Sequence, residues 1–434
     1  FILYPKNFNF MKISTKIMLC VMMFFNFFIW GIWFITMGPY LSKGNIQASG
    51  AEVAQAYATQ SWGAIIAPFI IGMIADKYFS AQKILGFLHI CGAILLFYIS
   101  DVQVFKNFYL LLLVYMILYM PSLSLTNAVA LNQMKNSEKE FSFVRMWGTI
   151  GWIVQGLIVG YLLISHFGFD VINDNEKQNN LNYTFKIAAV ISLFFGVFCY
   201  LLPNTPPNNK GKKTTISELL GLESLALLKN KNYLVFFVSS ILICIPLAFY
   251  YSFAGQFFGE INFSDYAKKM TFGQMSETIF LFIMPWFFTR LKVKKMLLLG
   301  MFSWALRYFF FSAGNINDLI WMLYGGIILH GICYDFFFVT GYIYTDQIAG
   351  EKIRASAQGF ITIATYGLGM LIGFKLSGII VDKYTIIDLT GKVVGHLWNK
   401  IWIWPASIAA AILVLFFIFF KEQNTNNKAT VSHH

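Results

Sequence analysis

The sequence predicts an all-α membrane protein whose helices cross a bilayer many times. Hydrophobic residues make up 58% of its 434 residues, whereas only 12% are charged. A soluble protein of this length needs considerably more charged surface. The apolar residues are also gathered in long runs, and about 20 mostly apolar residues are what a helix needs to span the hydrocarbon.

Twelve apolar runs are long enough to serve as membrane spans, and the longest linker, 204–232, follows the sixth. The runs lie at 17–41, 53–75, 82–100, 107–131, 142–165, 184–203, 233–258, 270–289, 295–314, 319–347, 355–381 and 399–420. We therefore predict two bundles of six transmembrane helices. The predicted parts are a cytoplasmic N-terminal segment (1–16), an N-terminal six-helix bundle (17–203), a cytoplasmic linker with an amphipathic helix (204–232), a C-terminal six-helix bundle (233–421) and a cytoplasmic tail (422–434).

The basic residues set the expected orientation. The net charge of +12 comes from 32 lysines and arginines against 20 aspartates and glutamates. Such an excess can indicate nucleic-acid binding, but here most basic residues lie in short loops between apolar runs, where they determine topology. Most of them share one side of the membrane if both termini are cytoplasmic. We therefore expect a multi-pass protein of the lipid bilayer, with both termini in the cytoplasm and no nucleic-acid partner.

Motifs typical of enzymes are absent from the sequence. It has no HExxH pattern, no clustered histidines and no glycine-rich phosphate loop, and its loops are too short for an added catalytic domain. The five cysteines lie inside apolar runs without paired spacing, so we interpret them as buried apolar residues rather than metal ligands or disulfides. We predict that the protein is not an enzyme and binds no metal.

The two halves of the chain share a short basic turn, which follows the second run at 68–77 and the eighth run at 285–290. Parallel six-helix repeats with a basic central loop are typical of the major facilitator architecture. Gly72, Asp76 and Lys77 match part of that superfamily's short-loop signature. We predict a conformational role for this loop; an ordinary charged turn is the alternative.

The fifth run carries an unusual polar face. Arg145, Thr149 and Trp152 are spaced at i, i+4 and i+7, so a helix places them on one side. Gly148 and Gly151 leave the adjacent surface thin enough for another helix to approach closely. An unpaired charge in hydrocarbon costs about 3 kcal/mol on insertion scales. We therefore expect this helix to line a polar cavity between the two halves, with an acidic partner from a distant run.

Two acids in later runs are candidate partners. Glu277 shares a helix face with Gln274, and it is expected to pair with Arg145 or with a substrate hydroxyl. The alternative is a solvated Glu277 near the outer mouth.

Asp335 lies in the middle of the tenth run. Burial favours the protonated form of a carboxyl group, which is the property that a proton-coupling site needs. The alternative is a structural ion pair with Arg307 or Lys375.

Aromatic residues and one histidine complete the candidate site. His330 and Tyr334 are spaced at i, i+4 and so share a face. His330 is either a hydrogen-bonded packing residue or part of the site. Four aromatic side chains could stack on a flat base, or could equally serve helix packing: Trp30, Trp33, Trp152 and Tyr334. Asn26, inside the first run, could bond across helices or reach a ligand.

Stretches from the first to the eleventh run keep the order of the motifs of one known family. They are Trp30-Gly31-Ile32-Trp33, Tyr119-Met120-Pro121-Ser122-Leu123, Arg145-Met146-Trp147-Gly148-Thr149-Ile150-Gly151, Leu219-Leu220-Gly221-Leu222 with Lys229-Asn230-Lys231, Gln274-Met275-Ser276-Glu277-Thr278, Tyr334-Asp335-Phe336-Phe337 and Ile353-Arg354-Ala355-Ser356-Ala357-Gln358-Gly359. On these stretches the chain resembles the nucleoside:proton symporter family of the major facilitator superfamily.

This resemblance implies uptake of nucleosides driven by inward proton flow through alternating access. It also implies a bacterial cytoplasmic membrane location, a monomer, and no cofactor beyond the proton gradient. The substrate-binding residues that we expect, from the resemblance and from the helix faces together, are Arg145, Thr149, Trp152, Gln274, Glu277, His330 and Tyr334. Asp335, with Glu277 as a second candidate, is expected to couple transport to protons.

The chain departs from the family pattern in two places. Apolar and aromatic residues at 248–251 replace a polar pair in the seventh span, and His330 replaces a tyrosine in the tenth. These departures leave the nucleoside preference open. The alternative functions are a sugar or oligosaccharide proton symporter of the same superfamily, and a nucleoside sensor that does not transport.

Overall fold

The computed structural model describes residues 12–70, 79–134, 137–160, 181–206, 222–389 and 391–421, and nearly all of them are helical. The first half contains α1 (Ile13–Lys43), α2 (Gly50–Ile70), α3 (Ala81–Ile99), α4 (Phe105–Asn132), α5 (Ser137–Ile158) and α7 (Asn182–Cys199). The second contains α9 (Lys231–Glu260), α10 (Tyr266–Ala313), α11 (Ile320–Tyr334), α12 (Thr340–Thr362), α13 (Met370–Lys383) and α14 (Trp398–Phe419). Two π-helical turns, η4 (Asp335–Val339) and η5 (Ile363–Gly369), flank α12, and a 3₁₀-helix, η3 (Leu222–Lys229), precedes α9.

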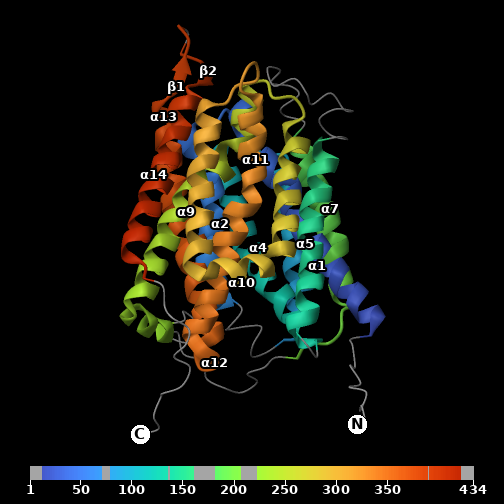
Figure 1. Cartoon of the computed structure of the whole chain (residues 1–434). Helices are drawn as coiled ribbons and strands as arrows, with labels where there is room; N and C mark the ends of the chain where they lie inside the picture. Colours follow the sequence, from blue (N-terminus) through green and yellow to red (C-terminus); the bar gives the residue numbers. More distant parts are fainter. Residues whose placement is uncertain are drawn as a thin grey trace, which may run out of the picture.

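The helices stand side by side in a tall bundle (Figure 1). A two-stranded antiparallel hairpin, β1 (Thr385–Ile387) and β2 (Val393–His396), projects from one end of it. The start of α1 and the end of α14 both lie at the opposite end of the bundle (Figure 1). Of the predicted linker, 222–229 forms η3, whereas 207–221 lies outside the described residues.

Within the described residues, nine helical stretches are long and apolar enough to cross a membrane. They coincide with nine of the predicted runs. The other three runs are 53–75, 142–165 and 270–289; their described parts fall on α2, α5 and the first part of α10, whereas 71–75 and 161–165 lie outside the described residues. The last two of these helices are less apolar because they carry Arg145, Gln274 and Glu277, which line a polar cavity. A helix that faces such a cavity is less apolar than one surrounded by lipid and packed side chains.

The predicted break between the runs 270–289 and 295–314 falls inside α10. Lys292 there has φ 56° and ψ 173°, which is not helical backbone, so α10 consists of two helices that meet at this residue. Both predicted runs are therefore present, one on each side of Lys292.

Glycines allow the closest helix contacts. A Cβ atom on Gly151 of α5 would lie 2.3 Å from the backbone oxygen of Phe24 in α1, so the prediction of a close approach at Gly151 is confirmed. Between the halves, a Cβ atom on Gly378 of α13 would lie 2.8 Å from Cα of Ala51 in α2. Helices α1 and α5 likewise pack against α9 and α10 of the second half.

The two halves are held together at the end that carries the hairpin. Asp382, near the end of α13, accepts a hydrogen bond of 3.0 Å from the backbone N–H of Ala51 at the start of α2. A carboxylate at this place satisfies a free N–H and suits the positive end of the helix dipole. The hairpin itself is fastened to α9, because Glu260 accepts from Trp398 Nε1 at 2.8 Å and lies 3.0 Å from His396 Nδ1.

Candidate substrate cavity

A cavity lies between the halves, and its space, including the part open to solvent, is about 890 Å³. Its walls come from α1 and α5 on one side and from α9, α10, α11 and η5 on the other. The lining residues are Phe27, Trp30, Phe34, Ile35, Arg145, Gly148, Thr149, Trp152, Tyr250, Tyr251, Gly255, Met270, Gln274, Glu277, His330, Tyr334 and Tyr366.

The wall from the first half is mainly aromatic. Phe27, Trp30 and Phe34 follow one face of α1 at i, i+3 and i+7. The ring of Trp152 from α5 meets that of Trp30 edge-on, with 5.3 Å between centroids. Phe34 reaches across to the second half, where its ring centroid lies 5.6 Å from that of Tyr251. Such a surface can hold a flat ring by stacking.

Arg145 brings a positive charge to this aromatic wall. Its guanidinium carbon lies 4.2 Å from the centroid of the Phe27 ring, which is a cation–π distance. Gly148 leaves room for the guanidinium, because a Cβ atom there would lie 2.7 Å from Nη1 of Arg145. The expected ion pair with Glu277 is not formed among the described residues, although both side chains line the cavity. The cavity itself separates them.

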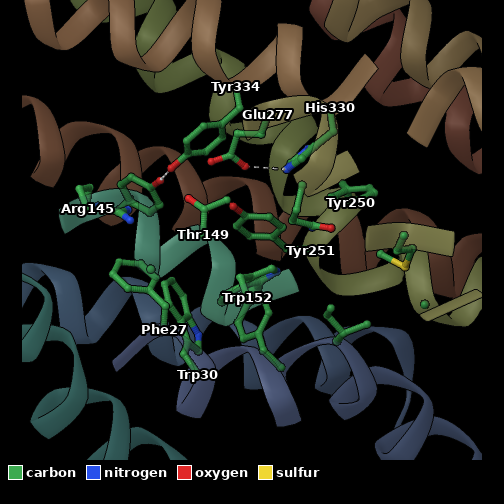
Figure 2. A pocket seen from close by; sticks show the side chains of 17 residues that line it. Phe27, Trp30, Arg145, Thr149, Trp152, Tyr250, Tyr251, Glu277, His330 and Tyr334 are labelled. Carbon is green, nitrogen blue, oxygen red and sulfur yellow. Dashed lines mark hydrogen bonds and ion pairs between the residues drawn. The ribbon is translucent and has the colours of Figure 1, made fainter. Parts of the chain in front are cut away.

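The wall from the second half carries the acid and the histidine. Gln274 and Glu277 both line the cavity from α10, and the Glu277 side chain is only 17% exposed. Glu277 therefore lies largely buried in the cavity wall rather than on an exposed surface. Its Oε2 lies 3.9 Å from Nε2 of His330, and Nδ1 of that ring accepts a 2.9 Å hydrogen bond from Arg307 Nη1. Figure 2 shows Glu277, His330 and Tyr334 facing Trp30, Phe27 and Trp152 across the cavity.

Asp335 lies outside this lining. It begins η4, its exposed fraction is 0%, and neither carboxylate oxygen has a hydrogen-bond partner. Neither Arg307 nor Lys375 forms an ion pair with it in the described part of the chain, so the interpretation as a structural ion pair is not supported. A fully buried acid without a partner is unusual, because ionising it would cost several kcal/mol.

All seven residues that we predicted to bind substrate line the cavity: Arg145, Thr149, Trp152, Gln274, Glu277, His330 and Tyr334. That they bind substrate remains a prediction. For Trp33 the packing alternative holds, because its side chain is fully buried and its ring stacks on Phe185 of α7, with 5.5 Å between centroids. Gly72, Asp76 and Lys77 lie outside the described residues.

Sequence reasoning missed six further lining residues, namely Phe27, Phe34, Ile35, Gly255, Met270 and Tyr366, and it noted the stretch with Tyr250 and Tyr251 only as a departure from the family pattern. The hydroxyls of Tyr366 and Tyr334 are hydrogen-bonded to each other. For Phe27 and Phe34, the helical spacing from Trp30 is a usable signal. Sequence reasoning did not place Arg307 at the site either; it stands behind the lining, donates to His330 and lies over the ring of Tyr250.

Comparisons with known proteins agree with this architecture. A family model described as "Nucleoside H+ symporter" matches residues 11–425. YegT of Escherichia coli strain K12, named as a candidate nucleoside transporter, is 40% identical over 95% of each chain. The xanthosine permease of the same strain is 29% identical, over 96% of this chain and 98% of its own.

The crystal structure of the nucleoside transporter NupG has the same fold. It superposes with a TM-score of 0.80 at 26% identity, covering 95% of this chain and all of that one. These neighbours are transporters and not enzymes, which confirms that part of the prediction. The chain therefore belongs to the nucleoside H+ symporter family of the major facilitator superfamily.

Proposed function

We propose that this protein takes up nucleosides together with protons across the cytoplasmic membrane by alternating access. The observation that carries the proposal is the central cavity, in which both halves of the chain combine aromatic rings with charged and polar side chains. Membership of the nucleoside H+ symporter family supports it, as do the nucleoside and xanthosine permeases among the relatives.

In this proposal the two walls recognise different parts of a nucleoside. The base stacks on Trp30 and Trp152, since stacking needs only a flat face on each partner. The ribose hydroxyls donate to the carboxylate of Glu277, and Gln274 can both donate and accept. Thr149, Arg145 and Tyr334 supply further hydrogen-bonding groups at the edges of the same space, and His330 supplies a ring nitrogen.

Proton coupling is assigned to Asp335, with Glu277 as the second candidate. Asp335 is fully buried without a partner, so its charge is costly unless it is neutralised by a proton. Protonation of either acid removes a negative charge from the region between the halves. That lowers the cost of closing them over the substrate. Protons and the substrate are then the only partners that the mechanism requires, and no cofactor takes part.

The proposed architecture has twelve transmembrane helices in two six-helix bundles, 17–203 and 233–421, with both termini cytoplasmic. The division of basic residues supports this orientation. The hairpin end is then outside the cell, and the contact between Asp382 and Ala51 closes the outer side. Rocking of the halves around the cavity would break that contact. The loop around Gly72, Asp76 and Lys77 is proposed to serve the same motion, and the protein to act as a monomer.

The proposal is tested with the purified protein in proteoliposomes. Uptake of labelled uridine, adenosine and xanthosine would be measured with and without an acidic outside. We expect uptake that the pH gradient drives uphill and that unlabelled nucleosides compete away. Competition by disaccharides but not nucleosides would make the protein a sugar symporter. Nucleoside binding without flux would make it a sensor. Either result overturns the proposal.

A further inference from the structure

Arg307 is a buried cation that the proposed transport mechanism does not yet use. Its exposed fraction is 0%, and it lies on the second part of α10, behind the cavity wall. Its guanidinium carbon stands 3.7 Å from the centroid of the Tyr250 ring. Among the described residues it forms no ion pair with a carboxylate, and its Nε and Nη2 have no hydrogen-bond partner. Its hydrogen bond to His330 is therefore its main polar contact.

This hydrogen bond fixes the state of the imidazole ring. A guanidinium has only donors and stays charged in proteins. Because Nη1 of Arg307 lies 2.9 Å from Nδ1 of His330, that nitrogen must be the acceptor and carries no proton. The proton of the neutral ring is then on Nε2. This nitrogen points toward Glu277 Oε2 at 3.9 Å.

Packing holds the ring in this orientation. A Cβ atom on Gly273 of α10 would lie 3.1 Å from Cβ of His330, so α10 and α11 are in close contact here. The centroid of the Tyr250 ring lies 5.6 Å from that of the imidazole, with 30° between the ring planes. The Tyr250 ring therefore restricts rotation of the imidazole on that side. Arg307 thus acts on a ring that has little freedom to turn.

We propose that Arg307 is a positioning residue, which holds His330 in the tautomer whose Nε2–H faces the cavity as a donor. This inference rests on the proposed function and adds a specificity to it. At 3.9 Å the contact between Nε2 and Glu277 is longer than a hydrogen bond, so the N–H remains available. It suits a ligand atom that only accepts, such as a carbonyl oxygen or an unprotonated ring nitrogen of a nucleobase. Glu277 beside it accepts from ligand hydroxyls.

The tautomer can be observed directly by NMR on the purified protein with ¹⁵N-labelled histidine. A His330→Gln variant identifies the His330 signals by their loss. We expect an unprotonated Nδ1 and a protonated Nε2 in the intact protein. A proton on Nδ1, or on both nitrogens, would overturn the inference. This measurement needs no transport, so its outcome is independent of whether nucleosides are the substrate.

A double-mutant cycle tests the consequence for transport. Arg307→Met removes the donor but keeps a long apolar side chain, which leaves His330 free to change tautomer. We expect the KM for nucleosides to rise about tenfold, as the loss of one oriented hydrogen bond implies. In a His330→Gln background the same change should alter KM less than about twofold.

Two outcomes of the cycle are informative in opposite ways. An Arg307→Met effect of equal size in both backgrounds would show a structural role and overturn the inference. If Arg307→Met does not fold, the NMR measurement on the intact protein decides alone. Absence of nucleoside uptake by the unmodified protein would contradict the proposed function, while the tautomer of His330 would still be decided by NMR.

Discussion

Two buried histidines, one in each half of the molecule, have opposite surroundings. His89 of α3 lies 2.9 Å from Oδ1 of Asn26 through Nε2 and 3.1 Å from the Ser192 hydroxyl through Nδ1. Its partners are neutral, come from α1 and α7, and do not line the cavity. His330 lies between the cation Arg307 and the carboxylate Glu277, and it does line the cavity.

Under the proposed function, one residue type serves structure in one bundle and recognition in the other. We call the hydrogen bonds around His89 the closed network, because its members bond to one another. Oδ1 of Asn26 also accepts from Ser122, and the backbone oxygen of Asn26 accepts from Tyr119. Hydrogen bonds of this kind between neutral groups of neighbouring helices stabilise helix packing. The His330 group is open, because its N–H and the acid opposite have room for a ligand. The partners of a buried histidine, and not the histidine itself, separate these roles.

The largest expected effect is at Glu277, the acid that faces His330 across the open group. Glu277→Gln removes the charged acceptor of the open group. We expect the uptake rate at low nucleoside concentration to fall about 100-fold, since hydrogen bonds to a charged group contribute up to about 3 kcal/mol. Uptake in proteoliposomes measures it. Glu260→Gln is the matched control at the hairpin end, outside the cavity, and should change KM less than about threefold. Equal losses in both variants would contradict the role of Glu277.

The second prediction compares the two histidines by the same substitution. His330→Gln should raise the KM for nucleosides about tenfold, because the fixed N–H donor is lost. His89→Gln should leave KM within about twofold, because no group of its network reaches the cavity. Concentration-dependent uptake gives both values. A larger KM change in His89→Gln than in His330→Gln would reverse the assignment.

How far the sequence predicted the site depends on how rare each residue type is within a membrane span. Arg145 and Glu277 stand out because charges in apolar runs are costly. Both line the cavity as expected. Tyr250, Tyr251 and Tyr366 were not predicted, because aromatic residues are common in such runs and most of them only pack. Their positions depend on contacts between helices far apart in sequence.

Two residues show the limits of helical periodicity. Trp30 and Trp33 are one turn apart on α1, yet Trp30 lines the cavity and Trp33 stacks on Phe185. Spacing gives relative faces but not which face points inward. Arg307 was considered as a partner of Asp335 and instead donates to His330. The fold is easier to predict, since run length and loop charge follow from the bilayer itself.

A third prediction concerns stability rather than transport. His89→Leu removes the donor to Asn26 and leaves the Ser192 hydroxyl without its contact to Nδ1. Hydrogen bonds between membrane helices contribute about 0.6 kcal/mol on average and at most about 1.7. We expect a loss of about 1–2 kcal/mol and a Tm in detergent that is lower by a few degrees. An unchanged Tm would contradict the structural role of His89.

The smallest expected effect lies at the edge of the closed network. The Ser192 hydroxyl donates to the backbone oxygen of His89 at 2.9 Å and contacts its ring. Ser192→Ala should cost about 0.6 kcal/mol, since the remaining bond to Asn26 still holds the ring. Thermal unfolding in detergent would show a small Tm decrease, with an unchanged KM. A changed KM would mean that the network around His89 communicates with the cavity through Trp30, whose ring packs 5.8 Å from that of Tyr119.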